Sequence, residues 1–343
     1  METILFLSHT DADGALPKAG LEALAAAKEL AGVLKGTLVA GVFGAQTAGA
    51  AAGLAGAGAA RALAVTGPDF ADARYATDAA AAEALCKAAG ATIVVAPGTS
   101  RLARVAAGVA HRLGGRVDTH ATALLAQDGA PAVSRWYYRQ RMEGVVKRTQ
   151  RPWVISIDPG CHAPWKPEGA APALEAVSVA VGDALRRTRV TGVKAPKSDA
   201  QTIRPDAKLL FVAGAGWTKK QASDGKPHVQ EAEALILDFL GKSKASLGSS
   251  KSLTDQAGEG QGVMGFMSHL NQVGQTGATP RHPKGLATCC HGEEPHVVGW
   301  RFISERRAVN LDPNCGWARG KADVLYVADA FEVMKKVNEL LKK

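Results

Sequence analysis

Residues 3–8, Thr3-Ile4-Leu5-Phe6-Leu7-Ser8, form a short and mostly apolar run that predicts a buried β-strand. Residues 18–34 follow with leucines near helical spacing, which predicts a helix. The alternation continues, with further strands predicted at 37–43, 61–66 and 92–96 and further helices at 45–60, 75–89 and 100–113. Strands that alternate with helices pair in parallel, so this part of the chain predicts a doubly wound α/β sheet.

The pattern changes after Val117, where residues 132–138, 144–149 and 153–157 predict consecutive strands without helices between them, an antiparallel addition to the sheet. Basic and aromatic residues interleave here. A single-strand nucleic-acid platform and a solvated hairpin are both compatible with this composition. We favour a subunit or domain interface, because Arg, Trp and Tyr are enriched at interfaces and no nucleic-acid module surrounds the hairpin. The residues concerned are Arg135, Trp136, Tyr137, Tyr138, Arg139, Arg141, Lys147, Arg148, Arg151 and Trp153.

A chain of 343 residues favours two domains. Residues 194–207 contain Pro196 and Pro205 among many polar residues and predict a linker. We therefore expect an N-terminal α/β domain at 1–193, which provides the partner interface, and a C-terminal domain at 208–343. The second domain begins with a predicted strand at 208–212 and a Gly-x-Gly turn, but Trp217 and its neighbours replace the third glycine of a dinucleotide-binding pattern.

Composition narrows the class of protein. No apolar run approaches the length of a membrane span, and no basic or arginine-rich leader precedes the first strand, so we expect a cytoplasmic protein without membrane insertion. The odd number of cysteines, five, lacks the paired spacing of a disulfide framework. The net charge of +9 suits a phosphorylated ligand, an acidic partner or nucleic acid and does not choose among them.

Two segments of the second domain have the composition of a ligand site. In Gln272-Val273-Gly274-Gln275-Thr276-Gly277 two glycines flank a polar pair, and glycine permits a sharp turn and a close approach of ligand to main chain. The segment His291-Gly292-Glu293-Glu294-Pro295-His296 predicts a turn from strand to helix. A helix N-terminus suits a phosphate or an electron-rich ring edge. Ordinary surface loops of an α/β domain remain the alternative.

The first of these segments resembles the flavin-site signature of the electron transfer flavoprotein alpha subunit family. The order of later segments agrees with the resemblance: the loop that ends at His296, then 308–313 (Ala-Val-Asn-Leu-Asp-Pro), then 327–331 (Val-Ala-Asp-Ala-Phe). The motifs are specific from about Lys208 onward, and the N-terminal half agrees in pattern. The resemblance implies a flavodoxin/Rossmann-like, FAD-binding C-terminal domain with a final helix.

The resemblance also implies roles for individual residues. Thr276 would bond near N5 of the flavin, and His296 would lie near the N1/O2 edge. Asn310 and Asp329 would hold the adenosine end, and Ala330 next to Asp329 is a further expected cofactor-binding residue. The remaining expected cofactor-binding residues line the ring, the ribityl chain or the pyrophosphate: Ser250, Lys251, Val273, Gly274, Gln275, His291, Gly292, Glu293, Glu294 and Pro295.

The function implied by the resemblance is that of an electron carrier without a substrate of its own. It would pair with a beta subunit, accept electrons from a flavin dehydrogenase and pass them to a quinone reductase. Three positions depart from the family pattern: Ala215 and Lys251 replace arginines, and His291 replaces a serine. A flavin-less structural or docking subunit is therefore the alternative.

Cys289, Cys290, His291, His296 and Cys315 also allow a zinc interpretation. We favour small buried residues at a strand end, because adjacent cysteines on a strand point to opposite faces and zinc sites usually space their cysteines by two to four residues. The sequence predicts no metal site and no catalytic Ser–His–Asp or paired-carboxylate arrangement.

Overall fold

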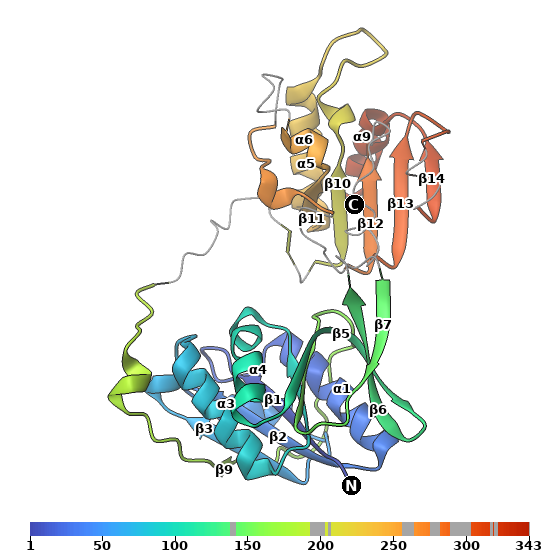
Figure 1. Cartoon of the computed structure of the whole chain (residues 1–343). Coiled ribbons are helices and arrows are strands. Elements are labelled where there is room, and N and C mark those ends of the chain that lie inside the picture. Colours follow the sequence, from blue (N-terminus) through green and yellow to red (C-terminus); the bar gives the residue numbers. More distant parts are fainter. Residues whose placement is uncertain are drawn as a thin grey trace. The chain divides into compact units, whose positions relative to one another are not determined.

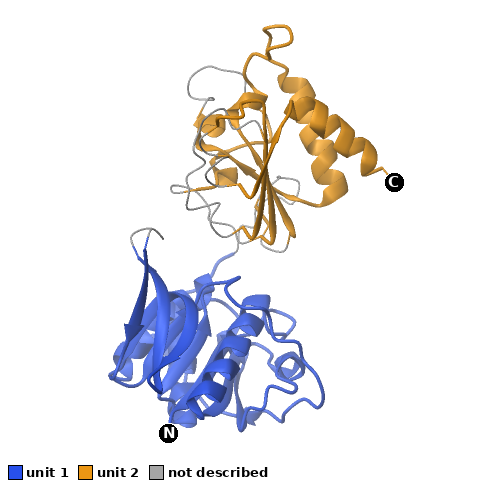
Figure 2. Cartoon of the chain, turned by 90° about the vertical axis from the view of Figure 1, so that its right-hand side faces the viewer, with its two compact units in different colours: residues 1–194 blue, residues 195–343 orange. Residues whose placement is uncertain are grey.

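The computed structural model describes residues 1–137, 142–192, 203–204, 207–255, 264–274, 282–288, 303–315, 318 and 322–342. The chain divides into two compact units, Met1–Lys194 and Ala195–Lys343, coloured blue and orange in Figure 2. Each unit has its own sheet and its own hydrophobic core.

The sheet of unit 1 has the strand order β7-β6-β5-β8-β4-β1-β2-β3-β9 (Figure 1). Neighbours pair in parallel from β5 to β9, whereas β5 with β6 and β6 with β7 are antiparallel. The strands are β1 (Thr3–His9), β2 (Thr37–Gly44), β3 (Arg61–Thr66), β4 (Ile93–Pro97), β5 (Arg116–Gln127), β6 (Ala130–Tyr137), β7 (Met142–Lys147), β8 (Trp153–Ile157) and β9 (Glu175–Ala176).

Helices cover both faces of this sheet. On β1, Ile4 belongs to a core cluster with Leu24 of α1, whereas Leu5 belongs to a second cluster with Leu85 of α3. Burial on both faces is why the strand is apolar without alternation. The predicted doubly wound sheet is therefore confirmed. The helices are α1 (Lys18–Leu34), α2 (Ala48–Gly53), α3 (Tyr75–Ala89) and α4 (Ser100–Arg112), with 3-10 turns η1 (Pro68–Phe70) and η2 (Asp183–Arg186).

The helix predicted over 45–60 is much shorter than expected, since α2 ends at Gly53. Gly56 and Gly58 follow with φ angles of 69° and 74°. These left-handed conformations are incompatible with a continued right-handed helix, and glycine adopts them at little cost.

The antiparallel part of unit 1 also differs from the prediction. Strand β5 was not predicted, and β8 lies inside the parallel sheet between β4 and β5 instead of extending the hairpin. A β-bulge between Ala121 and Ala123 and a left-handed His120 (φ 57°) interrupt the regular alternation of β5. The antiparallel addition is the β5-β6-β7 meander.

Unit 2 contains a parallel sheet in the order β11-β10-β12-β13-β14. Phe211 of β10 lies in one core cluster with Phe239 of α5 and Phe331 of α9, so these two helices cover one face. The elements are β10 (Leu209–Ala213), η3 (Ala215–Trp217), α5 (Val229–Ser243), β11 (Ser246–Ser249), α6 (Lys251–Asp255), η5 (His269–Asn271), β12 (Lys284–Thr288), β13 (Glu305–Asn310), β14 (Val324–Val327) and α9 (Ala330–Leu340). Within the described ranges, no helix has both the length and the apolar character needed to cross a membrane.

Candidate functional site

A cavity of about 350 Å³ lies at the carboxyl edge of the unit 2 sheet. Ligands of parallel α/β sheets bind at this edge, outside the ends of the strands. The wall of the cavity comes from the segments that follow β10, β13 and β14, namely Gly216, Lys220, Gln221, Ala222, Asn310, Leu311, Asp312, Ala328, Asp329 and Ala330. It contains three of the residues that the sequence analysis singles out, Asn310, Asp329 and Ala330.

Asp329 is fixed in the cavity wall because it caps helix α9. Its Oδ1 accepts hydrogen bonds from the backbone N–H of Phe331 at 2.8 Å and of Glu332 at 3.1 Å. An N-cap aspartate satisfies helix N–H groups that would otherwise have no partner. A carboxylate has about four acceptor positions, so the second oxygen remains able to accept hydrogen bonds from a ligand hydroxyl.

Asn310 ends β13 and ties the two neighbouring segments together. Its backbone carbonyl accepts a hydrogen bond from the N–H of Ala328 at 3.2 Å, and its side-chain Oδ1 accepts one from Asp312 at 3.1 Å. The residue is buried. Asn310 and Asp329 are thus held beside each other across the ends of β13 and β14.

A second group of predicted residues lies at the same carboxyl edge, beyond β10. The N–H of Ser250 donates to the carbonyl of Ala213 at 2.8 Å, and the N–H of Val273 donates to Ser249 at 3.0 Å. Val273 packs closely against Gly248 of β11, since a Cβ added to Gly248 would lie only 2.6 Å from Val273 Cγ2. Gly274 follows with φ 131°, a conformation that favours glycine.

Lys251 begins α6 directly after Ser250, whose Oγ accepts a hydrogen bond from the N–H of Leu253 at 3.3 Å. The Lys251 side chain is half exposed, and its Nζ lies 3.7 Å from Asp255. The structure therefore brings Ser250, Lys251, Val273, Gly274, Asn310, Asp329 and Ala330 to one edge of one sheet. The other predicted site residues lie outside the described residues: Gln275, Thr276, His291, Gly292, Glu293, Glu294, Pro295 and His296.

Most residues of the zinc interpretation also lie outside the described part of the chain, namely Cys289, Cys290, His291 and His296. The fifth, Cys315, is buried in the core of unit 2. Among the residues that the structure describes, no group of three or more His, Cys, Asp or Glu side chains is arranged to hold a metal ion.

In unit 1 a side-chain hydrogen bond joins the carboxyl ends of β1 and β4, the place where the strand order reverses. His9, at the end of β1, lies with Nε2 3.2 Å from Thr99 Oγ1 and Nδ1 3.2 Å from the carbonyl of Thr10. Burial lowers the pKa of His9, so its imidazole is neutral at pH 7.

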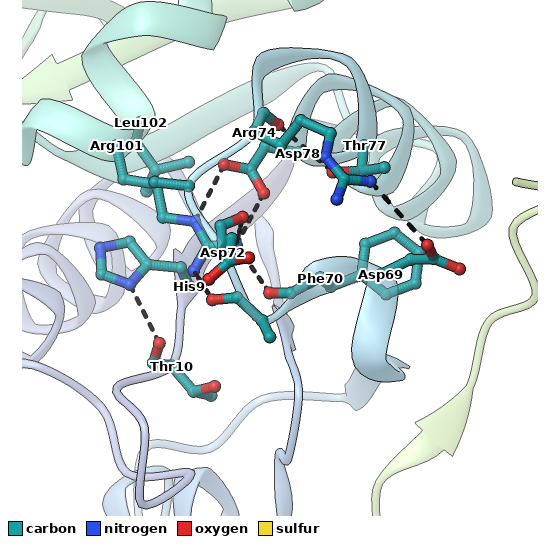
Figure 3. Close-up of polar contacts among 12 residues, drawn as sticks. His9, Thr10, Asp69, Phe70, Asp72, Arg74, Thr77, Asp78, Arg101 and Leu102 are labelled. Atoms are coloured by element: carbon teal, nitrogen blue, oxygen red, sulfur yellow. Dashed lines mark hydrogen bonds and ion pairs between the residues drawn. The ribbon is translucent and has the colours of Figure 1, made fainter. Parts of the chain in front are cut away.

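Figure 3 shows that Arg101 lies close to His9 and connects Asp78 to the chain around η1. Its Nη2 donates to the carbonyls of Phe70 at 2.7 Å and Asp72 at 3.1 Å. These bonds and the pair with Asp78 occupy the guanidinium. This edge of unit 1 is therefore internally bonded, in contrast to the cavity of unit 2.

Asp118 of β5 organises the basic and aromatic hairpin. Its buried carboxylate accepts hydrogen bonds from Arg135 at 2.9 Å, from Arg148 at 2.8 and 3.0 Å, and from the indole N–H of Trp153 at 2.9 Å. Burial by itself would raise the pKa of Asp118, but these hydrogen bonds outweigh it and lower the pKa. Arg135 and Arg148 thus neutralise an internal charge, which leaves fewer cations for a nucleic-acid platform.

The amino-acid sequence was compared with models of known protein families. The model of the electron transfer flavoprotein domain matches residues 4–184, which is more than half of the 343 residues. The chain belongs to the electron transfer flavoprotein family.

The matched range of this electron transfer flavoprotein covers unit 1 from β1 to η2. This range is the half of the chain that resembles the family in its pattern of strands and helices but contains no motif specific to the family. The resemblance to the family is confirmed there. The cavity lies in unit 2, outside the matched range.

Sequence reasoning did not single out Lys220 and Gln221 as site residues of this electron transfer flavoprotein, although both line the cavity. They lie in a turn closed by a bridge between Lys220 and Pro227. The sequence feature that could have pointed to these two residues is the Gly-x-Gly turn after the first strand of the domain. That pattern is weak by itself, and the third glycine of the fuller pattern is missing.

Proposed function

We propose that this chain is the FAD-carrying alpha subunit of an electron transfer flavoprotein. It forms a heterodimer with a beta subunit, accepts electrons from flavin dehydrogenases and passes them to a quinone reductase. Family membership supports the electron-transfer role. The single observation that supports FAD most directly is the cavity that brings Asn310 and Asp329 together at the carboxyl edge of unit 2.

The residues of the cavity fit the adenosine end of FAD. Its volume of about 350 Å³ lies near the lower end of the roughly 300–1,000 Å³ typical of small-molecule pockets, which suits one end of a long dinucleotide better than the whole. Asp329 would accept hydrogen bonds from ribose hydroxyls, and Asn310 would hold the base end.

The residues beyond β10 fit the other end of the cofactor. Ser250, Val273 and Gly274 form a close-packed, buried edge beside the strand ends, and the half-exposed side chain of Lys251 adds a positive charge. The Oγ of neighbouring Ser249 is buried without a hydrogen-bond partner among the described residues. When bound, FAD supplies the electron-carrying chemistry, and the chain orients it and balances its charge.

The test is to co-express the chain with its beta subunit and record the absorption spectrum of the purified heterodimer. We expect a yellow protein with about one FAD in its C-terminal unit. A folded, colourless heterodimer that does not take up added FAD would contradict the proposal.

A colourless heterodimer would favour the second candidate, a flavin-less docking subunit. One observation favours that candidate: Ala215 occupies the position where the resemblance expects an arginine, and it is completely buried in η3. The chain therefore has no cation at this position to stabilise a reduced flavin.

The partner surface that we propose is the β6–β7 hairpin. Tyr137 of β6 is stacked by Arg135, whose Cζ lies 4.7 Å from the ring centroid. Met142 and Val145 of β7 are large apolar side chains with 57% and 51% of their surface exposed in this chain. An arginine-supported aromatic residue beside exposed apolar residues is typical of protein interfaces.

A further inference from the structure

The turn from Lys220 to Pro227 contributes a fixed hydrogen-bond acceptor to the unit 2 cavity, the side-chain carbonyl oxygen of Gln221. We propose that this oxygen selects adenine at the base end of the bound nucleotide by accepting a hydrogen bond from the exocyclic amine. The inference rests on the proposed FAD-binding function and goes beyond it, because it assigns base recognition to Gln221.

The orientation of the Gln221 amide is determined by its neighbours. Its Nε2 lies 3.0 Å from the carbonyl oxygen of Gly216 and 2.8 Å from that of Lys219. Carbonyl oxygens only accept hydrogen bonds, so the NH2 group and not the oxygen must face them. Both N–H donors are therefore engaged with main chain.

The side-chain oxygen of Gln221, Oε1, is the polar group of this side chain that can still bind a ligand. Among the described residues, Oε1 of Gln221 accepts no hydrogen bond, and the residue lines the cavity. An amide oxygen has two lone pairs and cannot donate. The group at this part of the wall is consequently an acceptor that cannot change into a donor by rotating, since rotation would break two hydrogen bonds to the main chain.

The turn that holds Gln221 is rigidly bonded. The N–H of Gln221 donates to the carbonyl of Lys226 at 2.9 Å, and its own carbonyl accepts from Gly225 at 2.9 Å. Gly225 has φ 68°, which suits glycine at this corner. A pre-organised acceptor loses little conformational entropy when a ligand binds.

A fixed acceptor distinguishes the purine bases. Adenine presents an amino group at position 6, which donates, whereas hypoxanthine presents a carbonyl oxygen, which only accepts. With the hypoxanthine base, two acceptors would face each other, and the oxygen of this half-buried residue would lose water on binding without gaining a hydrogen bond. The two bases have nearly the same size and shape, but N1 also changes from an acceptor in adenine to a donor in hypoxanthine. The Gln221→Met variant therefore assigns the difference in affinity to the contact at position 6.

The experiment uses the full chain in its heterodimer, stripped of flavin, with adenosine 5′-diphosphate and inosine 5′-diphosphate as competitors of FAD. We expect the adenosine compound to bind roughly tenfold to a hundredfold more tightly. In Gln221→Met the ratio should fall to about threefold or less. Lys226→Met on the same turn is the matched control and should keep the wild-type ratio, because Lys226 does not line the cavity.

The outcomes separate the two proposals. If FAD binds and the two diphosphates compete equally against the wild-type protein, base selection by Gln221 is wrong and the FAD function stands. If Gln221→Met keeps the wild-type ratio, another group selects the base and the inference is likewise overturned. If neither FAD nor either diphosphate binds, the proposed function fails together with the inference.

Discussion

Arg101 and Asp78 form a two-point ion pair inside unit 1: Nε lies 2.9 Å from Oδ2, and Nη2 lies 2.7 Å from Oδ1. The Asp78 side chain is fully buried. Burial raises the pKa of Asp78, and Arg101 opposes this by stabilising the carboxylate. Such a pair adds little net stability over an apolar pair, but the loss of one partner leaves a buried charge without compensation.

Asp78→Ala should therefore lower the free energy of unfolding by about 3–5 kcal/mol. Glu175→Ala is the matched control, because Glu175 pairs with Arg61 on the exposed surface, and it should cost less than about 1 kcal/mol. Urea denaturation of both variants measures the difference. Equal losses in the two variants would mean that burial does not govern the Arg101–Asp78 pair.

Asp118→Asn should make stability less sensitive to acid. The folded-state pKa of Asp118 is lowered, so its contribution is present above the unfolded value of about 3.9 and is lost as pH falls through the folded pKa. At pH 7 we expect the variant to be less stable by about 3 kcal/mol, because Arg135 and Arg148 lose their charged partner.

The measurement is urea denaturation of wild type and Asp118→Asn at pH 7 and pH 3. The difference in free energy of unfolding should shrink at the lower pH, since protonated Asp118 resembles asparagine. Other acids titrate equally in both proteins and cancel. A difference that stays constant over this range would exclude the titration of Asp118 as its cause.

Asp329→Asn separates the two roles of this residue. Asparagine caps helices about as well as aspartate, so the free energy of unfolding should change by less than about 1 kcal/mol. Affinity for FAD should fall by roughly tenfold or more, because hydrogen bonds from ribose hydroxyls to a charged acceptor are lost. Asp323→Asn is the control, since Asp323 binds Arg306 on the same sheet and does not line the cavity.

Fluorescence titration with FAD and urea denaturation, on the same preparations, test this prediction. A variant that loses stability and affinity together would indicate that Asp329 acts only as a helix cap. Unchanged affinity would remove Asp329 from the proposed ribose site.

Lys251→Met should lower the first reduction potential of bound flavin by tens of millivolts. A half-screened charge near the ring contributes on the order of 1–3 kcal/mol, and each 1.4 kcal/mol is about 60 mV for one electron. The position of Lys251 near Asp255 and partly in solvent favours the lower end of this range. Lys251→Arg should preserve or raise the potential, because guanidinium keeps the charge and adds paired donors.

Spectroelectrochemical titration at one pH and salt concentration measures these potentials. Lys242→Met is the control, because Lys242 pairs with Asp238 on α5. Identical potentials in wild type, Lys251→Met and Lys251→Arg would show that Lys251 does not face the ring.

Replacing Tyr137 and Met142 with alanine should weaken the heterodimer by roughly tenfold or more, because aromatic and large apolar residues dominate interface energies. Val33→Ala removes an exposed apolar side chain from α1 and serves as the control. Sedimentation at several concentrations measures the dissociation constant. Tight, salt-sensitive binding of single-stranded DNA with an unaffected heterodimer would instead support the nucleic-acid interpretation.

The sequence predicted α1, α3 and β3 with the bounds that the structure has. In α3 the signal is local, because alanine-rich helical composition ends at Gly90, which adopts the left-handed conformation that terminates a helix. The strand β5 escaped prediction because its residues are mostly half-buried and a bulge interrupts their alternation. A period-2 signal requires one face in solvent and one in the core, and β5 has neither consistently.

Part of the candidate site was predictable for a similar reason. Asn310 and Asp329 follow apolar strands, and the carboxyl ends of parallel strands meet at one edge, so the strand pattern and the resemblance located them. Gln221 was not predictable. Its role depends on a turn that bonds back to Gly216 and Lys219, and no local pattern of residues specifies such a contact.

The amino-acid sequence alone determined the alternation of strands and helices, the two-domain α/β class and the resemblance to the electron transfer flavoproteins. These properties depend on the residue types within a few turns of chain. Only the tertiary structure decided that β8 pairs with β4, that Asp118 takes up two arginines of the hairpin, and that the segments after β10, β13 and β14 enclose one cavity. Each of these joins residues far apart in the chain, and such pairings are selected by the packing of the whole sheet.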